Sequence, residues 1–154
     1  MGQATRWLPW VLCVMVGVLV GVGTYTFRYA EGLSYLSNNP AACMNCHVMR
    51  EYYDSWARSS HHAGATCNDC HVPHAFPEKY LVKMDNGWNH GKKFTLQNFR
   101  EPIRIRRGNL LALQHNCVHC HEAAVQDIAS HLDVEEGKAR CTDCHRSVGH
   151  LALD

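Results

Sequence analysis

The hydrophobic pattern divides the chain into an apolar N-terminal run and a mixed remainder. Residues 7–27 carry no charge and are flanked by Arg6 and Arg28. About twenty apolar residues in a helix span the hydrocarbon core of a bilayer, and aromatic side chains at both ends of the run suit its two interfaces. The run therefore predicts one transmembrane anchor, with residues 1–6 before it and 28–154 after it. A cleaved signal peptide is the alternative.

After the anchor, the pattern predicts short helices joined by irregular chain. The segment that begins at Pro77 and Glu78 has both residues in the first turn of a helix, where they are favoured. Alternating runs long enough for a sheet do not occur. The predicted fold class is mainly α with much irregular loop, and the expected helices are 49–60, 77–88 and 123–132.

Composition changes this picture through two residue types. The sequence has 15 Lys and Arg against 14 Asp and Glu, so no charge excess indicates a nucleic acid partner. It also has nine cysteines and twelve histidines. Cys13 lies in the apolar run, and the other cysteines form four Cys-x-x-Cys-His motifs. Motifs 1 to 4 are Cys43–Cys46–His47, Cys67–Cys70–His71, Cys117–Cys120–His121 and Cys141–Cys144–His145.

The spacing of the motif follows from the way in which a haem is attached to the chain. Two thiols three positions apart form thioethers to the two vinyl groups of one porphyrin, and the histidine that follows supplies the proximal iron ligand. Zinc sites and disulfide frameworks also use many cysteines, but neither explains a histidine after the second cysteine in all four motifs. The sequence predicts four covalently bound haem c groups, with His47, His71, His121 and His145 as proximal ligands.

The motifs form two similar pairs. Cys43 and Cys67 are separated by the same 24 residues as Cys117 and Cys141. The pattern predicts a small tetrahaem domain built from two dihaem modules, at about 40–74 and 115–150. Because bacteria attach haem c outside the cytoplasmic membrane, we expect this domain to be periplasmic, the N-terminus to be cytoplasmic and the anchor to lie in the inner membrane.

Each iron needs a second ligand, and eight histidines lie outside the motifs. His61 or His62, just before motif 2, is an expected ligand, and His74 is another candidate. His150 is too near His145 to fold back onto the same haem, so we expect it to serve another haem. Met49 follows motif 1 closely enough to compete with His47 for the first iron. The remaining histidines are His90, His115, His119 and His131.

Two stretches, 33–61 and 79–90, carry a family resemblance together with the final segment 141–150. With the anchor, they resemble the NapC/NirT family of membrane-anchored tetrahaem quinol dehydrogenases. The resemblance covers nearly the whole chain, and the Cys-x-x-Cys-His-x-Met element is its most specific sign. It implies that the protein oxidises menaquinol at the membrane and passes electrons to a periplasmic multihaem reductase, the catalytic subunit of a nitrite reductase.

The resemblance also implies roles for single residues. It makes Met49 the axial ligand of the first haem, prefers His61 to His62, and gives His150 to another haem. It suggests that a residue of the partner enzyme completes one haem. Lys83 matches a lysine that contacts quinol. The family acid that accepts a proton has Asn86 in its place, with Asp85 one position earlier. Either Asp85 or a nearby histidine is expected to accept the proton, or the acid is absent.

Three alternatives stay open at this point. The quinol dehydrogenase could serve a nitrate or trimethylamine-oxide reductase, or the chain could be a soluble electron-transfer cytochrome released by signal cleavage. A zinc or disulfide protein is the third. We expect an oligomer to arise through the partner complex, and we do not expect this short chain to reduce nitrite itself.

Overall fold

The computed structural model describes residues 4–128, 131, 134 and 137–150. Contacts within the chain separate two compact units, residues 1–34 and 35–154. The first unit carries the long N-terminal helix, and the second carries all four Cys-x-x-Cys-His motifs.

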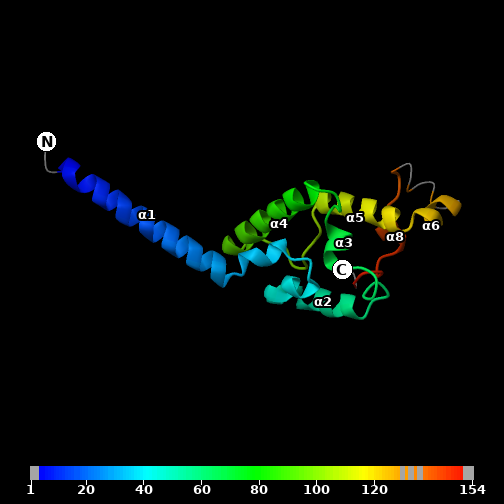
Figure 1. The fold of residues 1–154 in the computed structure, drawn as a ribbon. Helices are drawn as coiled ribbons and strands as arrows, with labels where there is room; N and C mark the ends of the chain where they lie inside the picture. The colour runs from blue at the N-terminus through cyan, green and yellow to red at the C-terminus, as the bar shows by residue number, and fades with distance from the viewer. Residues whose placement is uncertain (1–3, 129–130, 132–133, 135–136, 151–154) are drawn as a thin grey trace. The chain divides into compact units, whose positions relative to one another are not determined.

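α1 (Ala4–Tyr29) is one uninterrupted helix (Figure 1). Its stretch Arg6–Tyr29 is long and apolar enough to cross a membrane, and none of its most apolar window is buried within the protein. Large apolar side chains such as Leu19 are exposed along its length. This exposure excludes a buried core helix, whereas a membrane span and a signal sequence both fit the length and composition.

The rest of the described chain is helical, and no strand occurs among the described residues. This confirms the predicted fold class. α5 is the central element, since α3, α6 and α8 all pack against it, while α2 packs against η2 and η3. The elements are η1 (Gly32–Leu36), η2 (Pro40–Asn45), η3 (His47–Met49), α2 (Arg50–Ala57), α3 (Cys67–His71), α4 (Glu78–Thr95), α5 (Arg107–Cys120), α6 (Glu122–Asp127) and α8 (Cys141–Cys144).

α4 begins where the sequence predicted, but it continues for two more turns. Glu78 stands in its first turn and Lys92 and Lys93 in its last, so charges of both signs favour the helix dipole. Asn89 and Gly91 are weak helix formers, which hides this continuation in the sequence. The extension matters because it brings His90 onto the helix.

α5 was not predicted. Its apolar residues are spread around the helix rather than gathered in one stripe, so the periodic signal of an amphipathic helix is missing. The predicted helix 49–60 corresponds to α2. The first part of the predicted helix 123–132 corresponds to α6, and several of its later positions lie outside the described residues.

Polar contacts join α3 to α5. The buried side chain of Asn116 donates to the carbonyl oxygens of Val72 at 2.9 Å and Cys70 at 3.1 Å. Among the described residues, the polypeptide buries only three large apolar side chains: Trp56, Val72 and Val125. Because so little apolar surface is covered by the chain itself, specific hydrogen bonds such as these carry much of the packing of motif 2 against α5.

We expect Asn116→Ala to lower the free energy of unfolding by about 1–3 kcal/mol, because it leaves two buried carbonyl groups without a donor. Thermal unfolding of the haem-loaded protein in detergent, followed by circular dichroism, measures this loss. Asn98→Ala is the matched control at an exposed position. Equal midpoints for the two variants would contradict the role assigned to Asn116.

Candidate functional site

The motifs lie on short helical turns that set their cysteines correctly. Motif 2 forms α3, motif 4 forms α8, and motif 3 occupies the end of α5. Residues three apart in a helix lie on the same face, so both thiols of such a motif point to one side. Motif 1 differs because it lies on the 3₁₀ elements η2 and η3.

An aspartate inside each of motifs 2 and 4 caps its own turn. Asp69 accepts hydrogen bonds from the backbone N–H and the hydroxyl of Thr66, both at 2.8 Å. Asp143 accepts one from the backbone N–H of Arg140 at 3.0 Å. Such capping satisfies helix N–H groups that have no partner within the helix. The shared Asp of these two motifs is therefore explained by local folding rather than by the chemistry of the site.

The thiols of consecutive motifs lie close together. Cys43 and Cys67 are hydrogen-bonded, which lowers the pKa of Cys43 to about 7 and raises that of Cys67. Burial and the neighbouring Cys141 raise the pKa of Cys117 to about 11. Burial and, to a smaller extent, Asp69 and the Cys120 thiol of motif 3 raise the pKa of Cys70, so Cys70 lies near motif 3. Motif 1 therefore meets motif 2, motif 2 meets motif 3, and motif 3 meets motif 4.

Three motif histidines each face a histidine from a distant or different segment. The ring centroids of His71 and His150 are 6.1 Å apart, and those of His61 and His121 are 5.9 Å apart. The fourth motif repeats this arrangement, with 6.4 Å between the centroids of His131 and His145. The similar separation suggests a common cause.

An iron between the two rings would give a similar separation. An imidazole nitrogen binds a metal at about 2.0 Å and lies roughly 1.2 Å from the ring centre, so two histidines on opposite sides of one iron would put the centroids about 6.4 Å apart. Direct ring contact gives centroid separations of about 4.5–7 Å, so the spacing is compatible with a shared iron and does not by itself require one. The donor set thus fits three irons with two histidine ligands each.

His61 is oriented as a ligand should be. Its Nδ1 lies 3.0 Å from the carbonyl oxygen of Val148, to which an Nδ1–H donates. That bond leaves Nε2 free for a metal, the arrangement that orients ligand histidines generally. His62 instead meets Trp56 edge-on, with the centroids 5.0 Å apart. The geometry leaves His61 better placed than His62 to bind a metal, and its role as a ligand stays a prediction.

His71 has the protonation state that ligation needs. Burial, with a smaller contribution from His150, lowers its pKa to about 4. The imidazole is therefore neutral at physiological pH and carries a lone pair for a metal.

His131 is the ligand candidate that sequence reasoning left unselected. Its Nδ1 is buried and has no hydrogen-bond partner, a costly state for a polar atom. An iron held by His145 would relieve this cost if His131 bound it through this Nδ1. The only signal in the sequence was its place between motifs 3 and 4.

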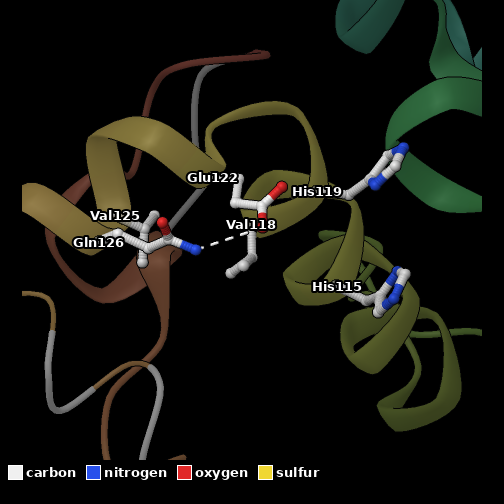
Figure 2. A pocket seen from close by; sticks show the side chains of 6 residues that line it. All are labelled: His115, Val118, His119, Glu122, Val125 and Gln126. Atoms are coloured by element: carbon white, nitrogen blue, oxygen red, sulfur yellow. Dashed lines mark hydrogen bonds between the residues drawn. The ribbon is translucent and has the colours of Figure 1, made fainter.

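The candidate ligand His74 has other neighbours. Its Nε2 lies 3.0 Å from the backbone oxygen of Asp69, and its ring meets that of His119 edge-on. His115 and His119 lie one helical turn apart beside a shallow recess of about 230 Å³ (Figure 2). Both side chains are exposed. The role of His74 as an iron ligand stays a prediction. Among the ring contacts of the described residues, none joins His74 to a motif histidine.

Motif 1 lacks a paired histidine among the described ring contacts. His47 is exposed, whereas Met49, at the end of η3, is half-buried. Motif 1 therefore differs in its surroundings from the other three motifs.

Lys83 is buried and fully engaged. Its Nζ donates to the backbone oxygen of Ser37 at 2.8 Å, to Asn38 Oδ1 at 3.1 Å and to the backbone oxygen of Leu36 at 3.4 Å. Burial and, to a smaller extent, Lys79 lower its pKa. A quinol oxygen would have to replace one of these acceptors. In this geometry Lys83 fastens the segment before motif 1 to α4.

Asp85 and Asn86 are also occupied. Asp85 forms an ion pair with Arg106 and accepts a hydrogen bond from Asn89 Nδ2 at 2.9 Å. Asn86 Oδ1 accepts from Asn109 Nδ2 at 3.0 Å. Both Asp85 oxygens are engaged by these partners, so the structure does not single out Asp85 as the proton acceptor.

Four motifs of this kind, with histidine pairs at the spacing of an iron, define a multihaem cytochrome of the c type on a small helical fold. Comparison with known proteins gives the same class. Residues 3–154 match the NapC/NirT cytochrome c family, N-terminal region, and the chain belongs to this family. Haem c is therefore its cofactor.

The relatives include subunits of nitrite reductase. The chain is 32% identical to the cytochrome c-type protein NrfH of Wolinella succinogenes, over 95% of this chain and 88% of that protein. It is 31% identical to the cytochrome c nitrite reductase subunit NrfH of Nitratidesulfovibrio vulgaris, over 91% and 84%. The fold matches a chain in the crystal structure of the cytochrome c nitrite reductase NrfHA complex bound to the inhibitor HQNO, with a TM-score of 0.67, 30% identity and 92% coverage of both chains.

We expect Lys83→Met to lower the free energy of unfolding by about 1–3 kcal/mol, because it removes the donor that three oxygens share. Lys79→Met, one turn earlier on α4, is the matched control. Thermal unfolding of the detergent-solubilised holoprotein measures both. A midpoint for Lys83→Met as high as that of Lys79→Met would show that the contacts to residues 36–38 contribute nothing.

Proposed function

We propose that this chain is a membrane-anchored tetrahaem cytochrome c that oxidises menaquinol and passes the electrons to a periplasmic nitrite reductase. The observation that carries the proposal is its similarity, over nearly its whole length, to NrfH proteins and to a chain of the NrfHA complex.

The proposal assigns four haems to the four motifs. His150, His61 and His131 complete the irons held by His71, His121 and His145, respectively. Met49 is the proposed axial ligand of the first haem, because it is half-buried where His47 is exposed. With His131 in place, the fourth haem does not need the residue that the resemblance expected from the partner enzyme.

The haems, when bound, accept electrons singly and relay them. The chain itself contributes the order of the four attachment sites. Cys43 meets Cys67, Cys70 lies near Cys120, and Cys117 meets Cys141. This succession supports a single path from motif 1 to motif 4, with quinol oxidised at one end and the partner reductase at the other.

Membrane attachment follows from α1. We infer that Arg6–Tyr29 spans the inner membrane with the N-terminus in the cytoplasm, which places the haem motifs in the periplasm, where haem c is attached. Motif 1 is the nearest of the four to the anchor in the sequence, so it is the natural entrance for electrons from a membrane quinol.

A second candidate function keeps quinol oxidation but gives the electrons to a different terminal reductase. The chain is 29% identical to the cytochrome c-type protein NapC of Haemophilus influenzae, over 94% of this chain and 80% of that protein. It is also 23% identical to TorY of Escherichia coli O157:H7, although it covers only 44% of that protein. The higher identity to NrfH favours nitrite reductase, and the enzyme that copurifies with the tagged chain decides between them.

We expect a water-soluble naphthoquinol to reduce all the haems of the purified chain, and nitrite to reoxidise them only when the catalytic nitrite reductase is added. Stopped-flow absorption of the haem bands measures both steps. Reoxidation by nitrite without the enzyme would contradict a pure electron-transfer role. A chain that dithionite reduces but quinol does not would contradict the quinol dehydrogenase.

We expect His131→Ala to convert one haem of four from the low-spin to the high-spin state, because the iron held by His145 loses its second strong ligand. Electron paramagnetic resonance of the chain, purified without partner, measures the change. His115→Ala, which alters an exposed histidine of α5, should leave the spectrum unchanged. Identical spectra for His131→Ala and wild type would show that His131 does not bind the fourth iron. His74 or a residue of the partner enzyme would then be its second ligand.

A further inference from the structure

Tyr35 and His90 form a pair on the face of α4 that also carries Lys83. The Tyr35 hydroxyl lies 3.0 Å from His90 Nδ1, and the two ring centroids are 6.0 Å apart. Lys83, Gly87 and His90 follow one another at the spacing of a single helical face. A Cβ added to Gly87 would lie 3.5 Å from Tyr35 Cδ1, so the phenol ring rests directly against the backbone of α4.

The pair lies beside the first haem site. Burial raises the pKa of Tyr35 to about 12, and Cys46 and Cys43 of motif 1 lie near its hydroxyl. Lys83, which holds residues 36–38 just after Tyr35, also lies near Cys43. The pair thus borders the site that the proposed function makes the electron entrance.

The two ends of the pair differ in exposure. Tyr35 is half-buried next to motif 1, whereas the His90 side chain is exposed to solvent. Partial desolvation, followed by the cations Arg106 and Lys93, lowers the pKa of His90. Its imidazole is therefore neutral at physiological pH, with one nitrogen able to accept a hydrogen bond. Asp85, the carboxylate that the sequence offered as proton acceptor, is engaged by Arg106 and Asn89.

Quinol oxidation needs such a path. A quinol that becomes a quinone loses two electrons and two protons, and the ferric haems take up only the electrons. The protons must leave through groups of the protein or through water. A base already engaged by arginine is poorly suited to this task, whereas a neutral imidazole open to solvent is well suited.

Building on the proposed function, we propose that Tyr35 and His90 form the proton exit for quinol oxidation at the first haem. The quinol hydroxyl gives its proton to the Tyr35 oxygen while Tyr35 passes its own proton to His90 Nδ1. The resulting imidazolium releases a proton to solvent, and Tyr35 ends as it began. Two such passages, each accompanied by one electron to haem, convert one quinol to quinone and leave no charge on the pair.

The test measures how fast a naphthoquinol reduces the haems of the full-length holoprotein in detergent, as a function of pH. Tyr35→Phe keeps the ring against Gly87 and removes only the hydroxyl. We expect Tyr35→Phe and His90→Gln each to slow reduction about tenfold or more at saturating quinol, as the loss of a general base does. The double variant should be no slower than the slower single variant, because either change breaks the same path.

The pH profile separates a proton path from a structural role. His90 accepts a proton only when neutral, so the wild-type rate should fall as the pH drops through the His90 pKa, below about 6.5. The slow rate of His90→Gln should lack this fall. Tyr80→Phe, an exposed tyrosine of α4, and His115→Gln are matched controls that should keep the wild-type rate and profile.

Two results would overturn the proton path: single variants as fast as wild type with its pH profile, or a double variant slowed by the product of the single effects. Haem content and the rate of reduction by dithionite, measured on every variant, identify any that fail to fold. If wild type itself is reduced by dithionite but not by quinol, the proposed function fails instead, and the two failures are thereby distinguished.

Discussion

The pairing of three motif histidines with histidines from other segments is the contact on which the second unit depends. Covalent attachment ties a haem to its motif, and under the proposed function the paired histidine supplies the second ligand of the iron. His61 reaches the histidine of motif 3, and His150 reaches that of motif 2. Each such pair closes a long loop, as a crosslink does, and restricts the unfolded chain accordingly. A chain that buries few apolar side chains of its own can be held together in this way.

α5 sets the order of motifs 2, 3 and 4 in the second unit. It packs against α3 and α8 and carries motif 3 at its end, so motifs 2, 3 and 4 all lie along one element. Asn116 fixes the register with α3 through two hydrogen bonds of ordinary length. Electron transfer between haems depends steeply on their separation. A rigid central helix is therefore a functional requirement as much as a structural one.

The first haem site is built differently from the others. It lies on 3₁₀ elements and is backed by α4, whose Lys83 fastens residues 36–38 in place. Tyr35, next to that segment, is consequently pinned between motif 1 and α4. This arrangement gives Lys83 a positioning role and leaves proton chemistry to the Tyr35 and His90 pair, because Asp85 is committed to Arg106.

The sequence alone determined the local features. The charge-free run predicted α1, and four identical motifs identified the cofactor, because thioether attachment needs only residues that are neighbours in the chain. It also pointed to His61 and His150 as ligands. Only the tertiary structure could match His150 with His71, bring His131 to His145, and place Tyr35 on His90. These contacts join segments that no local pattern relates, and α5, which organises most of them, has no periodic apolar stripe to reveal it. Ligand pairing is decided by how the chain packs, whereas haem attachment is decided by which residues follow one another.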